Sequence, residues 1–457
     1  REAREASGGV GRRREAREAS GGTGGVGRHG RRREEKMSKV NVATVFKPGG
    51  QPTVTYVSRD HLKLEQAVRR AIALPNAFVS ITGPSKSGKT VLCRTMMAGH
   101  QYVWVEGGQL TPLTNLWLKV ASELEQPSEI TRSQEKQTGI EAGVSAGGKA
   151  KIPFLIEGGG AANAKGSQVT TSLVSAMTEV DRQGACLDHM VRNDIALVID
   201  DFHYIERAQQ MELIRSLRGA VFNGLKVILL SVPHHAYDAQ QAEIEISGRF
   251  VHVEVPEWSS ADLREIAGRG FSALNVKCPK KIIDAFADEA QGSPNLMQQF
   301  CWDLCFEEGI DDDPSVTRRV SSRFDSNTIF RRLAADAGQP IYDRLASGPQ
   351  SRTQRLPRQL RQGGTADIYE AILIAISSTG PKKKLSYDEI RSALSDVLID
   401  KTPQKIEVSN ALTHLSKISE GISQNSRPIE WLPAELKLVL ADPLFRFFLR
   451  WKVRQGT

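Results

Sequence analysis

The stretch GPSKSGKT, residues 83–90, decides the fold of this chain. It fits the pattern G-x-x-x-x-G-K-[ST] at every fixed position. Glycines let backbone N–H groups curl around phosphates, where a side chain would block the approach. The lysine reaches the β- and γ-phosphates, and the closing hydroxyl ligates Mg²⁺. The stretch therefore predicts a phosphate-binding loop for ATP or a related triphosphate.

The residues around this loop predict a parallel α/β sheet. An apolar run at 77–82 has the length of a strand, and a helical stretch follows the loop at 91–98. A second strand is expected at 102–105 and a second helix at 113–124. An amphipathic helix is expected at 60–74, before the first strand. A helix that begins at the loop also points its positive dipole end at the bound anion. The predicted nucleotide-binding residues are Gly83, Pro84, Ser85, Lys86, Ser87, Gly88, Lys89 and Thr90.

The segment IALVIDD, residues 195–201, is the matching second motif. Its apolar residues predict a buried parallel strand, and two carboxylates follow at the carboxyl end. Ligands of an open parallel sheet bind at that edge. Asp200 is therefore expected to hold Mg²⁺ together with Thr90, and Asp201 to position or deprotonate the attacking water. The short Asp201 predicts slow hydrolysis.

The α/β alternation continues after this motif but is interrupted before it. A helix is expected at 209–220, and strands at 226–231 and 251–255. Residues 134–183 break the pattern with a segment rich in Gly and Ala. Within it, alternation near 140–144 suggests a weak hairpin, and 152–156 form an apolar island. A mobile insertion and a hairpin that contacts a partner are both consistent with this segment.

The order of these motifs over residues 58–304 resembles AAA+ ATPases, with the origin-initiator and STAND signalling ATPases as the nearest branches. This resemblance implies a P-loop NTPase core at 58–256, ATP and Mg²⁺ as ligands, and ATP hydrolysis. It makes Ser231, at the end of the strand KVILLS, a sensor of the γ-phosphate. It also makes Arg249, in SGRF, a finger that enters a neighbouring subunit's site. A plain strand-end serine and a surface arginine are the alternatives, and Arg264 or Arg269 could replace Arg249.

The resemblance further implies a helical lid at residues 257–310. Ser293 and Pro294 predict a helix start, with serine as the cap and proline at the first position. Asn295 follows, where initiator-type ATPases often carry a second sensor arginine. This departure favours a slow switch or a nucleotide-stabilised scaffold over a fast motor.

The remaining chain resembles the linker and winged-helix domain that follow the lid in both branches. Residues 314–365 look like a linker with some helix, and 366–457 like the winged helix. Helices are expected at 368–377, 387–398 and 405–418, with a closing helix at 441–451. The third helix offers few cations for DNA, but 382–384 form a basic turn. The linker adds Arg352, Arg355, Arg358 and Arg361.

Composition narrows the class of protein. The net charge is +8, but residues 1–36 carry ten Arg and one Lys against six Glu, so the other 421 residues carry only +3. This low-complexity tail is expected to be disordered, either as translated upstream sequence or as a basic arm. Five cysteines show no zinc spacing, and Cys301 and Cys305 are expected to be buried thiols. No apolar stretch has the length of a membrane span, and a cytoplasmic location is expected.

Three functions are consistent with these features. The first is an AAA+/STAND-type ATP switch that self-associates or signals through a protein partner, with defence as one setting. The second is a DNA-acting ATPase of the initiator or transposition-loader type, which would contact nucleic acid through the winged helix and linker. The third is a pseudo-ATPase scaffold that binds nucleotide without turnover. Sensitivity of DNA binding to salt separates the second from the others.

Overall fold

The computed structural model describes residues 40–110, 114–125, 179–232, 249–310, 315–350, 354–422 and 427–455. The N-terminal tail at 1–36, the hairpin expected near 140–144, the apolar island at 152–156 and Arg352 lie outside these ranges. Residues Val40–Thr457 form one compact unit.

Five strands form a parallel sheet in the order β2-β3-β4-β1-β5, which confirms the predicted α/β class. The inner strands β1, β3 and β4 are buried along their whole length, because helices cover both faces of the sheet. All five strands end at one edge, where the phosphate-binding loop begins. The strands are β1 (Phe78–Thr82), β2 (Tyr102–Glu106), β3 (Ala196–Asp200), β4 (Val227–Ser231) and β5 (Phe250–Glu254).

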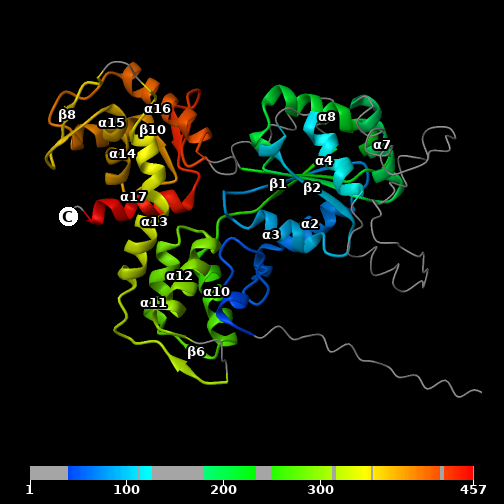
Figure 1. Ribbon diagram of the computed structural model, residues 1–457, viewed down its shortest axis with the longest axis horizontal. Coiled ribbons are helices and arrows are strands. Elements are labelled where there is room, and N and C mark those ends of the chain that lie inside the picture. Colours follow the sequence, from blue (N-terminus) through cyan, green and yellow to red (C-terminus); the bar gives the residue numbers. More distant parts are fainter. Residues whose placement is uncertain are drawn as a thin grey trace, which may run out of the picture. The chain divides into compact units, whose positions relative to one another are not determined.

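Helices cover the two faces of this sheet (Figure 1). One face packs against α4 (Thr114–Glu125), α7 (Glu179–Arg192) and α8 (Arg207–Phe222). The other face packs against α2 (Leu64–Ala73) and α3 (Lys89–Met96). Helix α7 begins at Glu179, before the predicted end of the insertion at 183. It packs on the sheet through the buried side chains of Cys186 and Met190.

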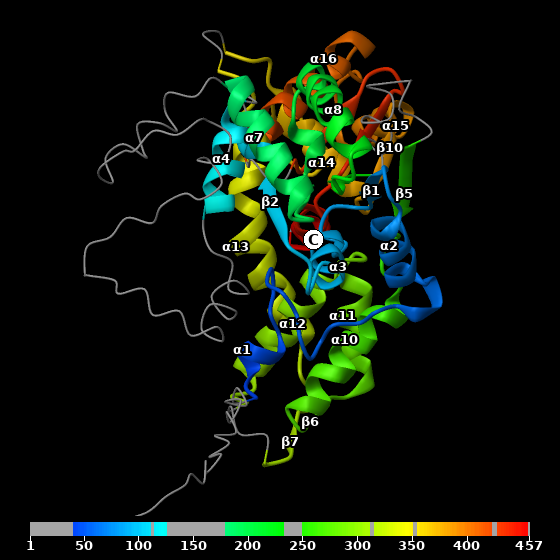
Figure 2. The same cartoon turned by 90° about the vertical axis from the view of Figure 1, so that its right-hand side faces the viewer.

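Among the described residues, the segment predicted as the lid contains three helices, which we call the lid helices: α10 (Ser260–Ala273), α11 (Lys280–Glu289) and α12 (Pro294–Glu307) (Figure 2). Ser293 caps α12 by accepting a hydrogen bond from the Leu296 N–H, and Pro294 is its first residue, as predicted. The short helix α1 (Val42–Val45) leads to Phe46, whose ring contacts Phe271 of α10 with 5.3 Å between the ring centroids. The short strands β6 (Val276–Lys277) and β7 (Arg318–Arg319) pair beside the bundle.

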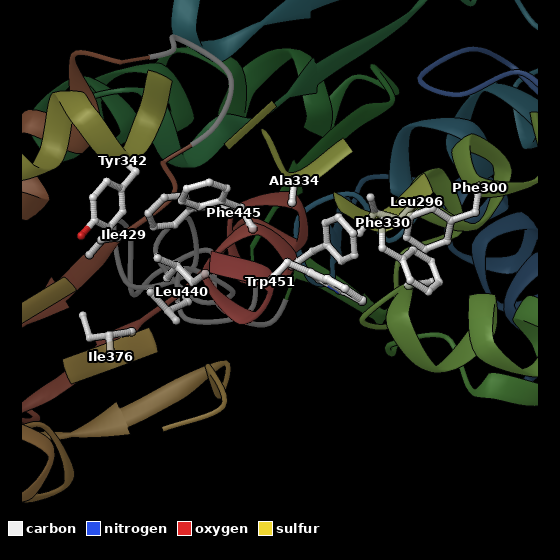
Figure 3. Packing of buried hydrophobic residues seen from close by; sticks show 14 of the residues in the cluster. Leu296, Phe300, Phe330, Ala334, Tyr342, Ile376, Ile429, Leu440, Phe445 and Trp451 are labelled. Carbon is white, nitrogen blue, oxygen red and sulfur yellow. The ribbon is translucent and has the colours of Figure 1, made fainter. Parts of the chain in front are cut away.

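The segment interpreted as a linker contains the long helix α13 (Ser326–Ala346). Its Phe330 ring lies 4.9 Å from Phe300 of α12 and 5.2 Å from Trp451 of α17 (Pro443–Gln455). Figure 3 shows these rings in one cluster of buried apolar side chains. Helix α13, in the segment predicted as a linker with some helix, therefore shares a hydrophobic core with both the lid helices and the C-terminal helix.

Before α17, the described part of the C-terminal region contains three helices and a three-stranded antiparallel sheet, in the order β10-β12-β11. Along the chain, a helix is followed by a strand, two helices and two strands. The three helices agree with the predicted ranges to within about two residues, the usual scatter of helix ends. They are α14 (Ile368–Ser378), α15 (Tyr387–Val397) and α16 (Lys405–Glu420), with strands β10 (Lys384–Ser386), β11 (Glu430–Leu432) and β12 (Lys437–Val439). A small hairpin, β8 (Arg358–Gln359) and β9 (Thr365–Ala366), precedes them.

Two further sequence-based expectations concern thiols and membranes. Cys301 and Cys305 are free and buried in the lid, as predicted. Among the described residues, no helix is both long enough and apolar enough to cross a bilayer.

Candidate nucleotide site

The loop at residues 83–88 connects β1 to α3 and has the backbone shape of an anion cradle. Lys86 and Gly88 have positive φ angles of 57° and 89°, and Gly88 is the residue from which α3 begins. A Cβ on Gly83 would lie 2.5 Å from the Val255 carbonyl oxygen, so only glycine fits there. The N-terminus of α3 points its unpaired N–H groups toward this loop.

Lys89 is buried and ties the loop together. Its Nζ donates hydrogen bonds to the carbonyl oxygens of Gly83 and Pro84, at 2.9 Å each. Burial lowers the pKa of Lys89 to about 8, against the opposing effect of Asp201 and Asp200. A bound phosphate would place negative charge beside this buried ammonium group and so stabilise its charged form.

The two predicted carboxylates lie beside the loop. Thr90 Oγ1 donates to Asp200 Oδ2 at 2.9 Å, and the Asp201 N–H donates to Asp200 Oδ1 at 3.0 Å. A hydroxyl and a carboxylate oxygen in contact are the protein ligands that suit Mg²⁺ at a phosphate site. The residues present therefore fit this ion.

Asp201 is placed differently from Asp200. It follows the last residue of β3, in the left-handed conformation with a φ of 52°, and lines the cavity above the loop. Burial and then the charge of Asp200 raise the pKa of Asp201 to about 7. Such a pKa suits a group that exchanges a proton near neutral pH.

Two adjoining pockets meet at the loop. One, of about 370 Å³, lies over Lys89 and Thr90 and is lined by Asp201 and, from the C-terminal region, Arg427 and Glu430. The other, of about 280 Å³, lies between the loop, the segment 47–59 and the lid. The first is lined mainly by polar and charged groups and the second has many apolar ones, as a triphosphate and a nucleobase require. The walls of the second include Tyr56, Val57, Leu64, Val91, Trp258, Ile266 and Pro294.

The sequence-predicted sensors have different positions. Ser231 is buried at the end of β4, opposite Thr82, and its carbonyl oxygen accepts the Gly83 N–H at 3.2 Å. Arg249 is exposed just before β5, with its guanidinium 5.4 Å from the Phe222 ring centroid. A five-residue strand spans about 15 Å, so Arg249 lies at the opposite edge of the sheet from its own loop.

Asn295 lines the second pocket at the start of α12. Its Oδ1 accepts the Gly49 N–H at 2.5 Å, and neighbouring Gln298 accepts the Lys47 N–H at 2.7 Å. The position predicted for a second sensor therefore holds the N-terminal segment to the lid. Sequence reasoning missed the segment 47–59, because it precedes the first predicted element and has no periodicity.

Sequence reasoning also missed the C-terminal residues at the site. Lys86 Nζ donates to both carboxylate oxygens of Asp442 at 2.9 Å, and the Asp442 side chain is only 4% exposed. The Arg427 guanidinium lies 5.2 Å from the ring centroid of Tyr204, three residues after Asp201. No local motif signals these contacts, since the partners of the first are 356 residues apart.

The family comparison agrees with this geometry. Residues 74–240 match the family model of the AAA domain. The AAA domain match covers all of β1, the loop and both Asp residues, and the fold is that of a P-loop AAA+ NTPase. No curated protein sequence matches the chain.

Several solved structures are similar to this chain at low sequence identity. The Walker-type ATPase PABY2304 of Pyrococcus abyssi has a TM-score of 0.50 and 13% identity, over 87% of this chain and 100% of that one. The Aeropyrum pernix ORC2 protein in its ADP form has a TM-score of 0.41 and 14% identity, over 91% and 97% of the two chains. The Thermotoga maritima RuvB Holliday junction branch migration motor has a TM-score of 0.37 and 12% identity, over 85% and 94%.

Proposed function

We propose that this protein is an ATP-dependent switch of the AAA+/STAND kind, in which the C-terminal region responds to the phosphates bound at the loop. The observation that carries the proposal is the contact of Lys86, a loop residue, with Asp442 of the C-terminal region. ATP would place its base in the pocket beside Trp258 and its phosphates over Lys89.

The proposed hydrolytic roles follow the positions of the side chains. Thr90 and Asp200 would hold Mg²⁺, which supplies positive charge against the phosphates. Asp201 would orient the attacking water and accept its proton, since it lines the phosphate cavity and its pKa is raised to about 7. Ser231 would lie near the γ-phosphate. The short Asp201 and the engagement of Asn295 with the backbone both favour slow turnover.

The switch would work by electrostatic competition. The Lys86 side chain is 29% exposed and faces the phosphate cavity, so its ammonium group is within reach of bound phosphate. A triphosphate would compete with Asp442 for Lys86 and would repel the carboxylates of Asp442 and Glu430. Loss of Lys86 would remove a cation from beside the buried Asp442 carboxylate and so weaken the contact between the loop and the C-terminal region. Triphosphate therefore favours release of the C-terminal region from the loop.

Further contacts hold the C-terminal region against the lid region, and we call this arrangement closed. Lys383 pairs with Glu257 at 2.8 Å, and Arg446 Nη2 donates to the Gln291 carbonyl oxygen at 3.2 Å. Arg450 pairs with Glu289 at 3.4 Å. These contacts join the lid region to the C-terminal region, so release has to break several interactions together. Contacts that break together would give two discrete arrangements, which a nucleotide switch requires.

The order of elements in the C-terminal region supports a winged-helix domain, and its charges favour a protein partner over DNA. Arg355 pairs with Asp367 at 2.6 Å, Arg358 is buried against Glu407, and Lys382 pairs with Glu389 at 2.7 Å. Cations that are engaged in this way are poor phosphate ligands, because binding DNA would cost them their partners. Output through a protein partner or a second copy is therefore the proposed role of this domain.

The exposed position of Arg249 supports self-association. Because it lies at the far edge of its own sheet, it can act at a phosphate only in another copy of the chain. An arginine supplied from a neighbour stabilises charge that develops during phosphoryl transfer. Assembly would therefore complete the site.

The test compares the full chain without nucleotide, with Mg–ADP and with a Mg-bound non-hydrolysable ATP analogue. Small-angle X-ray scattering measures the radius of gyration, which increases if the C-terminal region is released, and light scattering measures the mass of the particle. We expect expansion and assembly with the analogue alone, loss of both in Lys89→Ala, and expansion without nucleotide in Asp442→Asn. Asp396→Asn, an exposed carboxylate of the same region, is the matched control and should stay closed.

Identical size and mass in all nucleotide states would overturn the switch proposal. Stimulation of turnover by duplex DNA, with affinity that falls steeply with salt, would favour the DNA-acting alternative.

A further inference from the structure

A tryptophan next to the lid makes a direct hydrogen bond to the phosphate-binding loop. Trp258 Nε1 donates to the Ser87 carbonyl oxygen at 2.7 Å. Trp258 follows β5 by four residues and precedes Ser259, the cap of α10. The bond therefore joins the beginning of the lid to the peptide that links Ser87 to Gly88.

Peptide geometry gives this bond a consequence at the phosphates. A trans peptide is planar, so its C=O and N–H groups point in opposite directions. If Trp258 holds the Ser87 carbonyl oxygen on its own side, the Gly88 N–H points to the other side. Within the part of the chain that the structure describes, the Gly88 N–H has no protein acceptor. Gly88 lines the phosphate cavity, so this N–H is available to a bound anion.

Trp258 is itself held in place. The Arg59 guanidinium lies 4.4 Å from the centroid of its ring, and Arg59 Nη1 donates to the Pro256 carbonyl oxygen at 2.9 Å. Arg59 is only 5% exposed and has a φ of 52°. Burial lowers the pKa of Arg59, against the opposing effect of Asp262. A cation stacked on a tryptophan is attracted to the face of the ring, so the indole has little freedom to turn.

We propose that Trp258 is a positioning residue that orients the Ser87–Gly88 peptide, so that the Gly88 N–H faces the phosphates of the nucleotide. This inference rests on the proposed nucleotide site and deepens it. Backbone N–H groups of such a loop hold the phosphates nearest the ribose, which ADP and ATP share. The indole N–H therefore acts on binding of both nucleotides and has no effect on the base.

The same bond couples the lid to the loop. Any displacement of α10 moves Trp258, because only Ser259 separates them. If the indole moves, its hydrogen bond to the Ser87 carbonyl oxygen breaks. The Ser87–Gly88 peptide can then rotate, and the Gly88 N–H no longer has a fixed direction. The chain thus has a route from phosphate to lid that does not use Asn295, whose side chain is engaged with Gly49.

The test removes the indole N–H and keeps the ring. Benzothiophene in place of the Trp258 indole, introduced as an unnatural amino acid, has sulfur where the N–H was. Trp258→Phe is a second variant, which uses a standard amino acid that also has no ring N–H. The same replacements at Trp104 are the matched control, because Trp104 also stacks on an arginine, Arg94, at 4.6 Å but lines neither pocket.

Binding of ADP and ATP is measured by calorimetry, and binding of adenosine by ligand-observed NMR. The benzothiophene at residue 258 should weaken ADP and ATP about threefold to tenfold, the range expected for one hydrogen bond. Adenosine affinity should not change, and neither should any affinity in the Trp104 controls. Unchanged ADP affinity, or an equal loss for ADP and adenosine, would overturn the inference. Failure of the unaltered protein to bind ADP or ATP would instead overturn the nucleotide site.

Discussion

Substitution of Gly338 by alanine tests whether α13 and α17 form one rigid core. Gly338 is buried in the middle of α13, where it faces Phe448 of α17. A Cβ placed on Gly338 would lie closer than 3.0 Å to the Cβ, Cγ and Cδ2 of Phe448. Ordinary carbon contacts lie at about 3.5–4.0 Å, so the two helices would have to separate.

The expected loss of stability follows from two opposing effects. Replacing glycine by alanine inside a helix stabilises it by about 0.5–1 kcal/mol. Overpacking a core costs about 1–3 kcal/mol, and the upper end applies here. The Phe448 Cβ is attached to the backbone, and its ring is packed against Tyr342 at 5.7 Å and Phe445 at 6.1 Å. We therefore expect Gly338→Ala to lower the free energy of unfolding by about 2 kcal/mol.

Urea unfolding followed by tryptophan fluorescence and circular dichroism measures this loss, and Trp451 reports from the same aromatic cluster. Gly219→Ala is the matched control. Gly219 lies in the helix α8 and has nothing within 4 Å of an added Cβ, so alanine there should stabilise by about 0.5–1 kcal/mol. The reasoning is refuted if Gly338→Ala is as stable as the unaltered protein, or if both variants change stability in the same direction.

Three further predictions concern ionisation, thiols and assembly. Burial and then Asp200 raise the pKa of Asp201 to about 7, so the folded protein keeps a proton that the unfolded chain loses near pH 4. The thermal midpoint of the nucleotide-free protein should therefore decrease as the pH rises from about 4 to 7, and this decrease should be smaller in Asp201→Asn. An equal dependence of the midpoint on pH in both proteins contradicts the assignment. Burial raises the pKa of Cys93 and of Cys305 to about 12, so iodoacetamide should label these thiols only after unfolding, and mass spectrometry that finds them labelled in the native protein would disprove this. Arg249→Ala and Asp201→Asn should each lose ATP turnover, and mixing them should restore part of it, since one copy then supplies the arginine and the other the carboxylate; no recovery in the mixture argues against a shared site.

Much of the P-loop fold could be predicted because its signals are local. The loop, the strand that precedes it and the apolar strand that ends in Asp200 each lie within a few consecutive residues. Buried parallel strands are apolar along their whole length, and this makes them visible in a sequence. The helix start at Ser293 and Pro294 was predictable for the same reason, since capping depends on neighbouring residues.

The α13 segment shows where local signals become weak. Polar and charged residues give it the composition of a linker, and Pro340 lies inside the helix. Its buried side chains are spread along the whole helix, and a glycine at 338 is unfavourable inside a helix unless a close neighbour such as Phe448 requires it. Only the packing of α17 explains why this position is small.

The sequence by itself determined the chemistry of the site, and only the tertiary structure decided what surrounds it. Gly83, Lys89 and Thr90 were predicted because phosphate and metal binding require those residue types at a fixed spacing, and Asp200 because it ends an apolar strand at the ligand-binding edge of the sheet. The bonds of Trp258 to Ser87 and of Lys86 to Asp442 join residues 171 and 356 positions apart. Which distant side chains meet depends on how helices pack and where their side chains point, and no short pattern encodes that.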